Sequence, residues 1–149
     1  MTVYEQLKAF KKEYPFTIAW RLRKHAKIVD MHLNPDEKVL FCFAAQKGFS
    51  AIDIFSTFAV VLTNKRIILA RKRLLFGYIF LAITPDMFND LTVSSRILWC
   101  NINIDTVKEL VVLSNISKRA ANTIETHITE YMMGEKKKYG YVHNREDRK

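Results

Sequence analysis

The sequence predicts an α+β fold that is mainly β, in which seven antiparallel strands close into a barrel or sandwich and one helix follows them. Between residues 38 and 113, seven short segments rich in aromatic and β-branched residues are separated by short polar links. Such a succession is typical of strands that pair in chain order. After the last segment, apolar residues recur every four positions, which is the spacing of a helix with one buried face.

Length and composition are those of one folded domain. The chain has 149 residues, of which 49% are hydrophobic and 12% aromatic, enough to build a core. Its longest apolar stretches, residues 49–62 and 74–83, are interrupted and fall short of the ~20 residues that a membrane-spanning helix needs. The chain opens on polar residues rather than on a secretory signal, and it has two cysteines. We therefore expect a cytoplasmic protein without disulfides, which would meet the inner face of a membrane only peripherally.

Residues 1–33 are predicted to form a pair of helices. Thr2 and Glu5 have the spacing of a capping box, and Pro15 is expected to end the first helix. Thr17 is expected to cap the second helix, because a threonine hydroxyl there would accept a hydrogen bond from the first turn.

The seven strands are predicted from runs of β-prone residues bounded by turn signals. They are expected at residues 38–45, 56–62, 67–70, 78–83, 88–93, 97–104 and 109–113. Cys42 and Cys100 fall inside two of these strands and are predicted to be core residues. In the turn at residues 63–66, Asn64 is expected to adopt a positive φ.

The C-terminal helix is expected to be capped by Asn115 or Ser117 and to end at Gly134. Its buried stripe is predicted to consist of Ile116, Ala120, Ile124, Ile128 and Met132. The residues after it show no apolar period and are predicted to be disordered. The chain is thus divided into a helical pair (1–33), a barrel with its C-terminal helix (34–133) and a basic tail (134–149).

Three local sequences resemble the bacterial pleckstrin-homology-like domains of the YokE type over about residues 34–133. They are Asn34-Pro35-Asp36-Glu37 before a strand, the hairpin sequence VLTNKRII at residues 61–68, and Ile102-x-Ile104 before Ile116-x-Lys118. The resemblance implies a seven-stranded barrel plugged by the C-terminal helix, and a binding module rather than an enzyme. It also implies that some relatives assemble into rings through strand edges.

Eukaryotic lipid-binding domains of this fold place a lysine and an arginine at the end of the first strand and on the second. The present chain offers Lys47 alone, and residues 50–62 carry no cation. This difference argues against recognition of inositol phosphates in that manner.

The sequence ARKRLLF at residues 70–76 is the most conspicuous candidate site. Loops after the first, third and sixth strands are expected to share one end of the barrel. The candidate rim for an anionic phospholipid or phosphorylated ligand therefore comprises Lys47, Arg71, Lys72, Arg73 and Lys108. Leu74, Leu75 and Phe76 would add apolar burial in a membrane. Alternatively, the cations are a solvated hairpin tip that guards an edge strand, and the three apolar residues face the core.

The net charge of +9 does not by itself indicate nucleic acid. The excess is +4 over residues 1–33, +2 over residues 34–114 and +3 over residues 115–149. The second helix carries Arg21, Arg23, Lys24, His25 and Lys27. It has no helix-turn-helix partner with a glycine turn, and no aromatic–basic RNA motif is present. A solvated helix face is therefore favoured over a nucleic-acid interface.

Residues typical of catalysis are scattered. The four histidines do not have metal-ligand spacing, and no glycine-rich phosphate loop occurs. Asp86 and Asp90 are interpreted as turn and strand-start residues rather than as a catalytic carboxylate pair. We expect no enzymatic activity, metal or cofactor. The predicted function is a non-catalytic binding module that docks on an anionic membrane or phosphorylated ligand. The alternative, about equally favoured, is a protein–protein or homo-oligomer module that uses a strand edge or the N-terminal helices.

Overall fold

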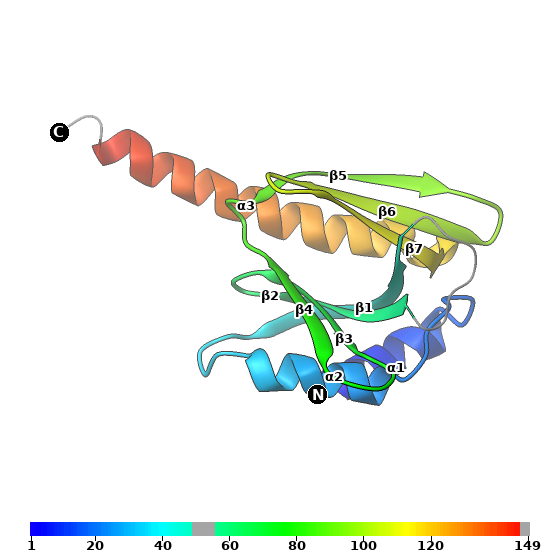
Figure 1. The fold of residues 1–149 in the computed structure, drawn as a ribbon. Coiled ribbons are helices and arrows are strands. Elements are labelled where there is room, and N and C mark those ends of the chain that lie inside the picture. The colour runs from blue at the N-terminus through cyan, green and yellow to red at the C-terminus, as the bar shows by residue number, and fades with distance from the viewer. Residues whose placement is uncertain (49–55, 147–149) are drawn as a thin grey trace.

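A computed structural model describes residues 1–48 and 56–146, with side chains described as far as Glu135 and at Lys138. Seven strands curl into a half-barrel that lies between two N-terminal helices and one long C-terminal helix (Figure 1). The helices are α1 (Val3–Glu13), α2 (Leu22–His32) and α3 (Ala121–Glu146). The strands are β1 (Val39–Lys47), β2 (Thr57–Thr63), β3 (Ile67–Lys72), β4 (Tyr78–Ile83), β5 (Phe88–Ser95), β6 (Trp99–Thr106) and β7 (Leu110–Ser117). The predicted fold class is confirmed.

The strands form one antiparallel sheet in the order β4-β3-β2-β1-β7-β6-β5. β1 is the central strand and pairs with β2 over most of its length. It pairs with β7 only through its last two residues, Gln46 and Lys47. In the described part of the chain no ladder joins β4 to β5, so the sheet remains open along that seam.

Both faces of the half of the sheet that contains β2 and β3 are buried. One face lies in the core that contains Phe43, to which α3, packed beside β5, contributes Ile124, Ile128 and Met132. On the opposite face, α1 and α2 pack a second core. All seven residues of β2 are buried as a result. This two-sided burial explains the continuous apolar sequence of β2 and β3, and it makes the N-terminal helices a fixed part of the fold.

The N-terminal helices follow the sequence prediction in one cap and differ in the other. The capping box is confirmed: Thr2 N–H donates to the Glu5 carboxylate at 2.8 Å, and Glu5 N–H donates to Thr2 Oγ1 at 3.1 Å. The prediction that Thr17 caps the second helix is wrong. Its hydroxyl oxygen accepts a hydrogen bond from Ser117 N–H at 3.0 Å, so it ties the helix connection to β7. Helix α2 begins only after Arg21, which has a φ of 57°.

The C-terminal helix continues beyond the predicted stop. Gly134 lies inside α3, which extends to Glu146, so the prediction of disorder from residue 134 fails that far. Glutamate and lysine are good helix formers, and the Lys138 ammonium pairs with the Glu135 carboxylate at 3.0 Å one turn away. Residues 147–149 lie outside the described part of the chain.

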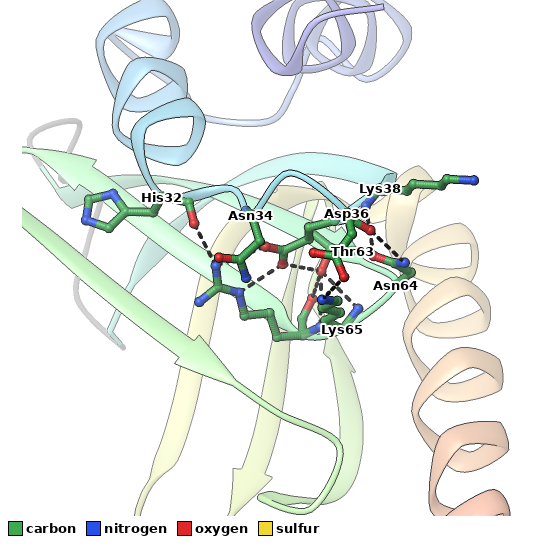
Figure 2. Close-up of polar contacts among 9 residues, drawn as sticks. His32, Asn34, Asp36, Lys38, Thr63, Asn64 and Lys65 are labelled. Atoms are coloured by element: carbon green, nitrogen blue, oxygen red, sulfur yellow. Dashed lines mark hydrogen bonds and ion pairs between the residues drawn. The ribbon is translucent and has the colours of Figure 1, made fainter.

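The two motifs that precede β1 and follow β2 meet in space (Figure 2). The buried Glu37 carboxylate accepts hydrogen bonds from Arg66 Nε at 2.9 Å, Arg66 Nη2 at 3.0 Å and Thr63 Oγ1 at 2.7 Å. At the surface, Lys65 Nζ lies 2.5 Å from Asp36 Oδ2. This polar joint fixes the entry into β1 against the β2–β3 turn.

Asn64 contributes to the joint differently from the prediction. Among the described residues, the non-glycine positions with positive φ are Arg21 and Asn115, so the predicted positive φ of Asn64 is wrong. Instead, its side-chain oxygen accepts a hydrogen bond from Lys38 N–H at 2.8 Å, and its own N–H donates to the Lys38 carbonyl at 2.9 Å. The asparagine therefore pairs with the start of β1, a role that the local sequence could not indicate.

Opposing effects set the pKa of Glu37. Burial raises it, but hydrogen bonds from Arg66, Thr63 and Asn34 N–H, together with the Arg66 charge, lower the pKa from 4.5 to about 2. Because the folded pKa lies below the unfolded value, the ionised carboxylate stabilises the fold above pH 4.5. That contribution is lost as the pH falls towards 2.

We predict that Glu37→Gln reduces the free energy of unfolding at pH 7 by on the order of 3 kcal/mol, because it removes the buried charge partner of Arg66. Urea denaturation at pH 7 and pH 3 measures this. The difference between wild type and variant should shrink by about 2 kcal/mol at pH 3, where the wild type has lost much of the same contribution. Asp36→Asn, at the exposed ion pair, is the control and should change stability little. An equal difference at both pH values would contradict the prediction.

Candidate functional site

The β3–β4 turn presents three large apolar side chains to solvent. Arg73 N–H donates to the Gly77 carbonyl at 3.0 Å, which closes a three-residue loop, and Gly77 has a φ of 73° that suits glycine. The loop residues Leu74, Leu75 and Phe76 are 57%, 80% and 85% exposed. The alternative that they face the core is therefore wrong.

The base of this turn is anchored to the start of α2. Lys72 N–H donates to Nδ1 of the buried His25 at 2.9 Å. Burial lowers the pKa of His25 to about 4, although a hydrogen bond with the Trp20 backbone raises it; the charges of Arg21 and Arg71 lower it further. The imidazole is therefore neutral near pH 7 and can accept the hydrogen bond. The Arg21 guanidinium also lies 3.5 Å from the Lys72 carbonyl oxygen.

The cations beside the turn come from two strands at one end of the sheet. Arg71 and Lys72 are half-buried at the end of β3, and Arg73 is exposed. The Arg71 guanidinium lies over the Phe58 ring, 5.6 Å from its centroid. Lys47 ends β1, whose register with β2 places it at this end. Two strand spacings, roughly 10 Å, separate β1 from β3.

Lys108 lies elsewhere. It belongs to the β6–β7 turn, where Val107 N–H donates to the Met87 carbonyl at 2.9 Å. With Ile83 it lines the seam between the two edges of the sheet. Figure 1 shows the β6–β7 turn beside the β4–β5 connection, on the opposite side of the molecule from the β3–β4 turn. The structure thus places Lys47 and Arg71–Arg73 at one end and does not bring Lys108 to them.

Trp20, Arg21 and His25 belong to the same surroundings, although the sequence prediction did not connect them with the turn. Trp20 is 39% exposed, and the Arg21 guanidinium lies 5.6 Å from its ring centroid. The basic, aromatic character of this segment is visible in the sequence. Its proximity to β3 depends on how α2 crosses the sheet, and no local pattern encodes that crossing.

The two cysteines are buried, and the two aspartates considered as a carboxylate pair accept local hydrogen bonds. Burial raises the pKa of the Cys42 thiol to about 12, helped by the Asp30 charge, and burial raises that of Cys100 to about 11. Asp86 accepts from the Thr84 hydroxyl at 2.5 Å, and Asp90 from Leu91 N–H at 2.8 Å. In the described residues no three potential metal ligands converge, and no helix has an apolar stretch that could cross a bilayer.

Comparison with known proteins identifies the family. The chain is similar to a pleckstrin homology domain from Shewanella amazonensis SB2B whose crystal structure is known. The TM-score is 0.48 at 17% identity, with 76% of this chain and 89% of that chain covered. No curated protein matches the chain. The sequence profile of the family described as "Bacterial PH domain" matches residues 33–130, more than half of the chain. The chain therefore belongs to the bacterial PH domain family.

Proposed function

We propose that this protein is a non-catalytic binding module that docks on an anionic membrane surface through the β3–β4 turn. The observation that carries the proposal is the exposure of Leu74, Leu75 and Phe76 directly beside three cations. Contiguous exposed apolar side chains on a soluble domain are costly unless they meet a partner surface. Membership of the PH domain family supports a binding role and does not name the ligand.

The two parts of the turn would act on different layers of the membrane. Arg73 and Lys72, joined by Lys47 and Arg71, would meet anionic headgroups at ~1 kcal/mol per cation. The tip would reach the acyl boundary, where each buried CH₂ contributes ~0.8 kcal/mol. Each contribution alone gives weak, reversible binding, and their combination gives stable docking. The anchoring of Lys72 to His25 limits the conformational freedom that docking would remove.

Removing two cations at the base of the turn should weaken docking. For Lys72→Ala with Arg73→Ala we expect a loss of about 2 kcal/mol, or roughly thirtyfold, in affinity for phosphatidylglycerol-containing vesicles. Co-sedimentation measures the affinity at rising salt, which should weaken the wild type more than the variant. The matched control is Lys38→Ala with Lys108→Ala, which removes the same charge far from the turn and should bind as the wild type does. Equal binding of the wild type to anionic and neutral vesicles at low salt would refute the proposal.

Replacing apolar residues of the tip should weaken membrane docking and leave thermal stability almost unchanged. We expect Leu75→Ser with Phe76→Ser to lower vesicle affinity at least tenfold, because the CH₂ and ring burial is lost. The melting temperature should move by less than about 2 °C, because both side chains are exposed. The control is Ile97→Ser with Leu98→Ser in the β5–β6 turn, where Ile97 is 89% exposed. If the tip variant and this control bind vesicles equally, the tip does not enter the membrane.

A second candidate function is homo-oligomerisation through a strand edge. The open seam leaves β4 and β5 as the two edges of the sheet, and an edge strand can pair with another chain. The N-terminal helices are less suited to this role, because their apolar faces already pack on β1–β3.

The strand-edge candidate predicts that light scattering gives a mass above 17.5 kDa at rising concentration. Thr92→Lys, on the exposed side of β5, should restore the monomer mass because a charge at an edge opposes pairing. A monomer at every concentration would exclude this candidate and leave the membrane proposal unaffected.

A further inference from the structure

We infer that a second site, the pocket between α1 and the start of α2, binds a phosphomonoester group. The pocket has a volume of about 350 Å³ and is distinct from the β3–β4 turn. Four cations line it, Lys8, Lys11, Arg21 and Arg23, together with the rings of Tyr4 and Trp20. This inference goes beyond the proposed membrane docking and does not depend on it.

The charge of the pocket is not balanced by carboxylates. None of its lining residues is acidic. The ion pairs found among the described residues are Lys65–Asp36, Arg66–Glu37 and Lys138–Glu135, and they leave these four cations out. Gathering four positive charges around one concavity is repulsive, and a bound dianion would relieve that repulsion.

The two arginines are held in place by aromatic rings rather than by acids. The Arg23 guanidinium lies 4.9 Å from the Tyr4 ring centroid, and that of Arg21 lies 5.6 Å from the Trp20 centroid. A stacked guanidinium keeps its N–H edge available for two parallel hydrogen bonds to phosphate oxygens. Because the guanidinium groups already lie over these rings, the arrangement favours a phosphate over a flat aromatic ligand.

Lys11 fixes the side of the pocket formed by the connection between α1 and α2. Its ammonium donates to the carbonyls of Pro15 and Thr17 at 2.7 and 2.5 Å, so it holds the connection between α1 and α2. The start of α2 adds to the positive potential. It has no side-chain cap and no acidic residue in its first turn, where most helices place them. Lys8 is exposed and can turn towards a ligand, while the exposed Arg23 presents its N–H edge from the Tyr4 ring.

A phosphomonoester could reach this pocket from solution or from a lipid headgroup. Arg21 lines the pocket and also approaches the Lys72 carbonyl at the base of the β3–β4 turn. The pocket therefore lies close to the surface that we propose faces the membrane. The chemistry that it recognises is the same for either source, and the experiment separates the two.

The test is titration of the full chain with inorganic phosphate and with glycerol 3-phosphate, followed by amide NMR shifts at constant ionic strength set with chloride. We expect saturable shifts at residues 8 and 20–23, and at least tenfold weaker binding by Lys8→Gln with Arg23→Gln. The control, Lys27→Gln with Lys38→Gln, removes two exposed lysines outside the pocket and should keep wild-type affinity. Circular dichroism melting checks that each variant is folded.

Vesicles distinguish the sources. Tighter binding to phosphatidic acid than to phosphatidylglycerol, lost in Lys8→Gln with Arg23→Gln, supports a lipid headgroup. Saturable binding of glycerol 3-phosphate without that lipid preference supports a soluble ligand. Shifts that are the same in wild type and pocket variant, or absent in both with no lipid preference, overturn the inference. The variant Leu75→Ser with Phe76→Ser should keep phosphate binding, so failure of membrane docking does not affect this result.

Discussion

The buried pairing of Glu37 with Arg66 is the constraint on which the half-barrel depends. It joins the residue that leads into β1 to the turn between β2 and β3, and Arg66 also donates to the His32 carbonyl at the end of α2 at 2.8 Å. One guanidinium therefore fixes the central strand, the adjacent hairpin and the N-terminal helices relative to one another. Losing one partner would leave the other as an uncompensated buried charge, which is among the costliest defects a core can carry.

That joint and the two-sided burial of β2 together make the β3–β4 turn a rigid support. β3 is held by β2 on one side and β4 on the other, and His25 attaches its last residue to α2. The apolar tip thus projects from a well-packed base rather than from a loose loop. Proteins commonly carry binding residues on loops that a rigid scaffold positions.

The sequence predicted the strands well because their β-prone runs are bounded by turn residues, and β4 matches residues 78–83 at both ends. It could not show that Thr17 would pair with β7, since that contact spans 100 residues. The placement of Lys108 failed for a geometric reason. In a regular meander the loops after the first, third and fifth strands share an end, whereas Lys108 follows the sixth strand. The sequence could not show that Leu75 is exposed, because an apolar loop and the start of a buried strand have the same apolar pattern.

The exposed tip has a consequence for the protein in concentrated solution. Three contiguous exposed apolar side chains favour self-association of the chain at high concentration. The formal charge of +9 opposes this, because like-charged molecules repel one another before their tips can touch. The same surplus of lysine and arginine that would attract the domain to a negative surface therefore also opposes self-association. Neutralising it would weaken both the attraction to that surface and the repulsion between copies of the chain.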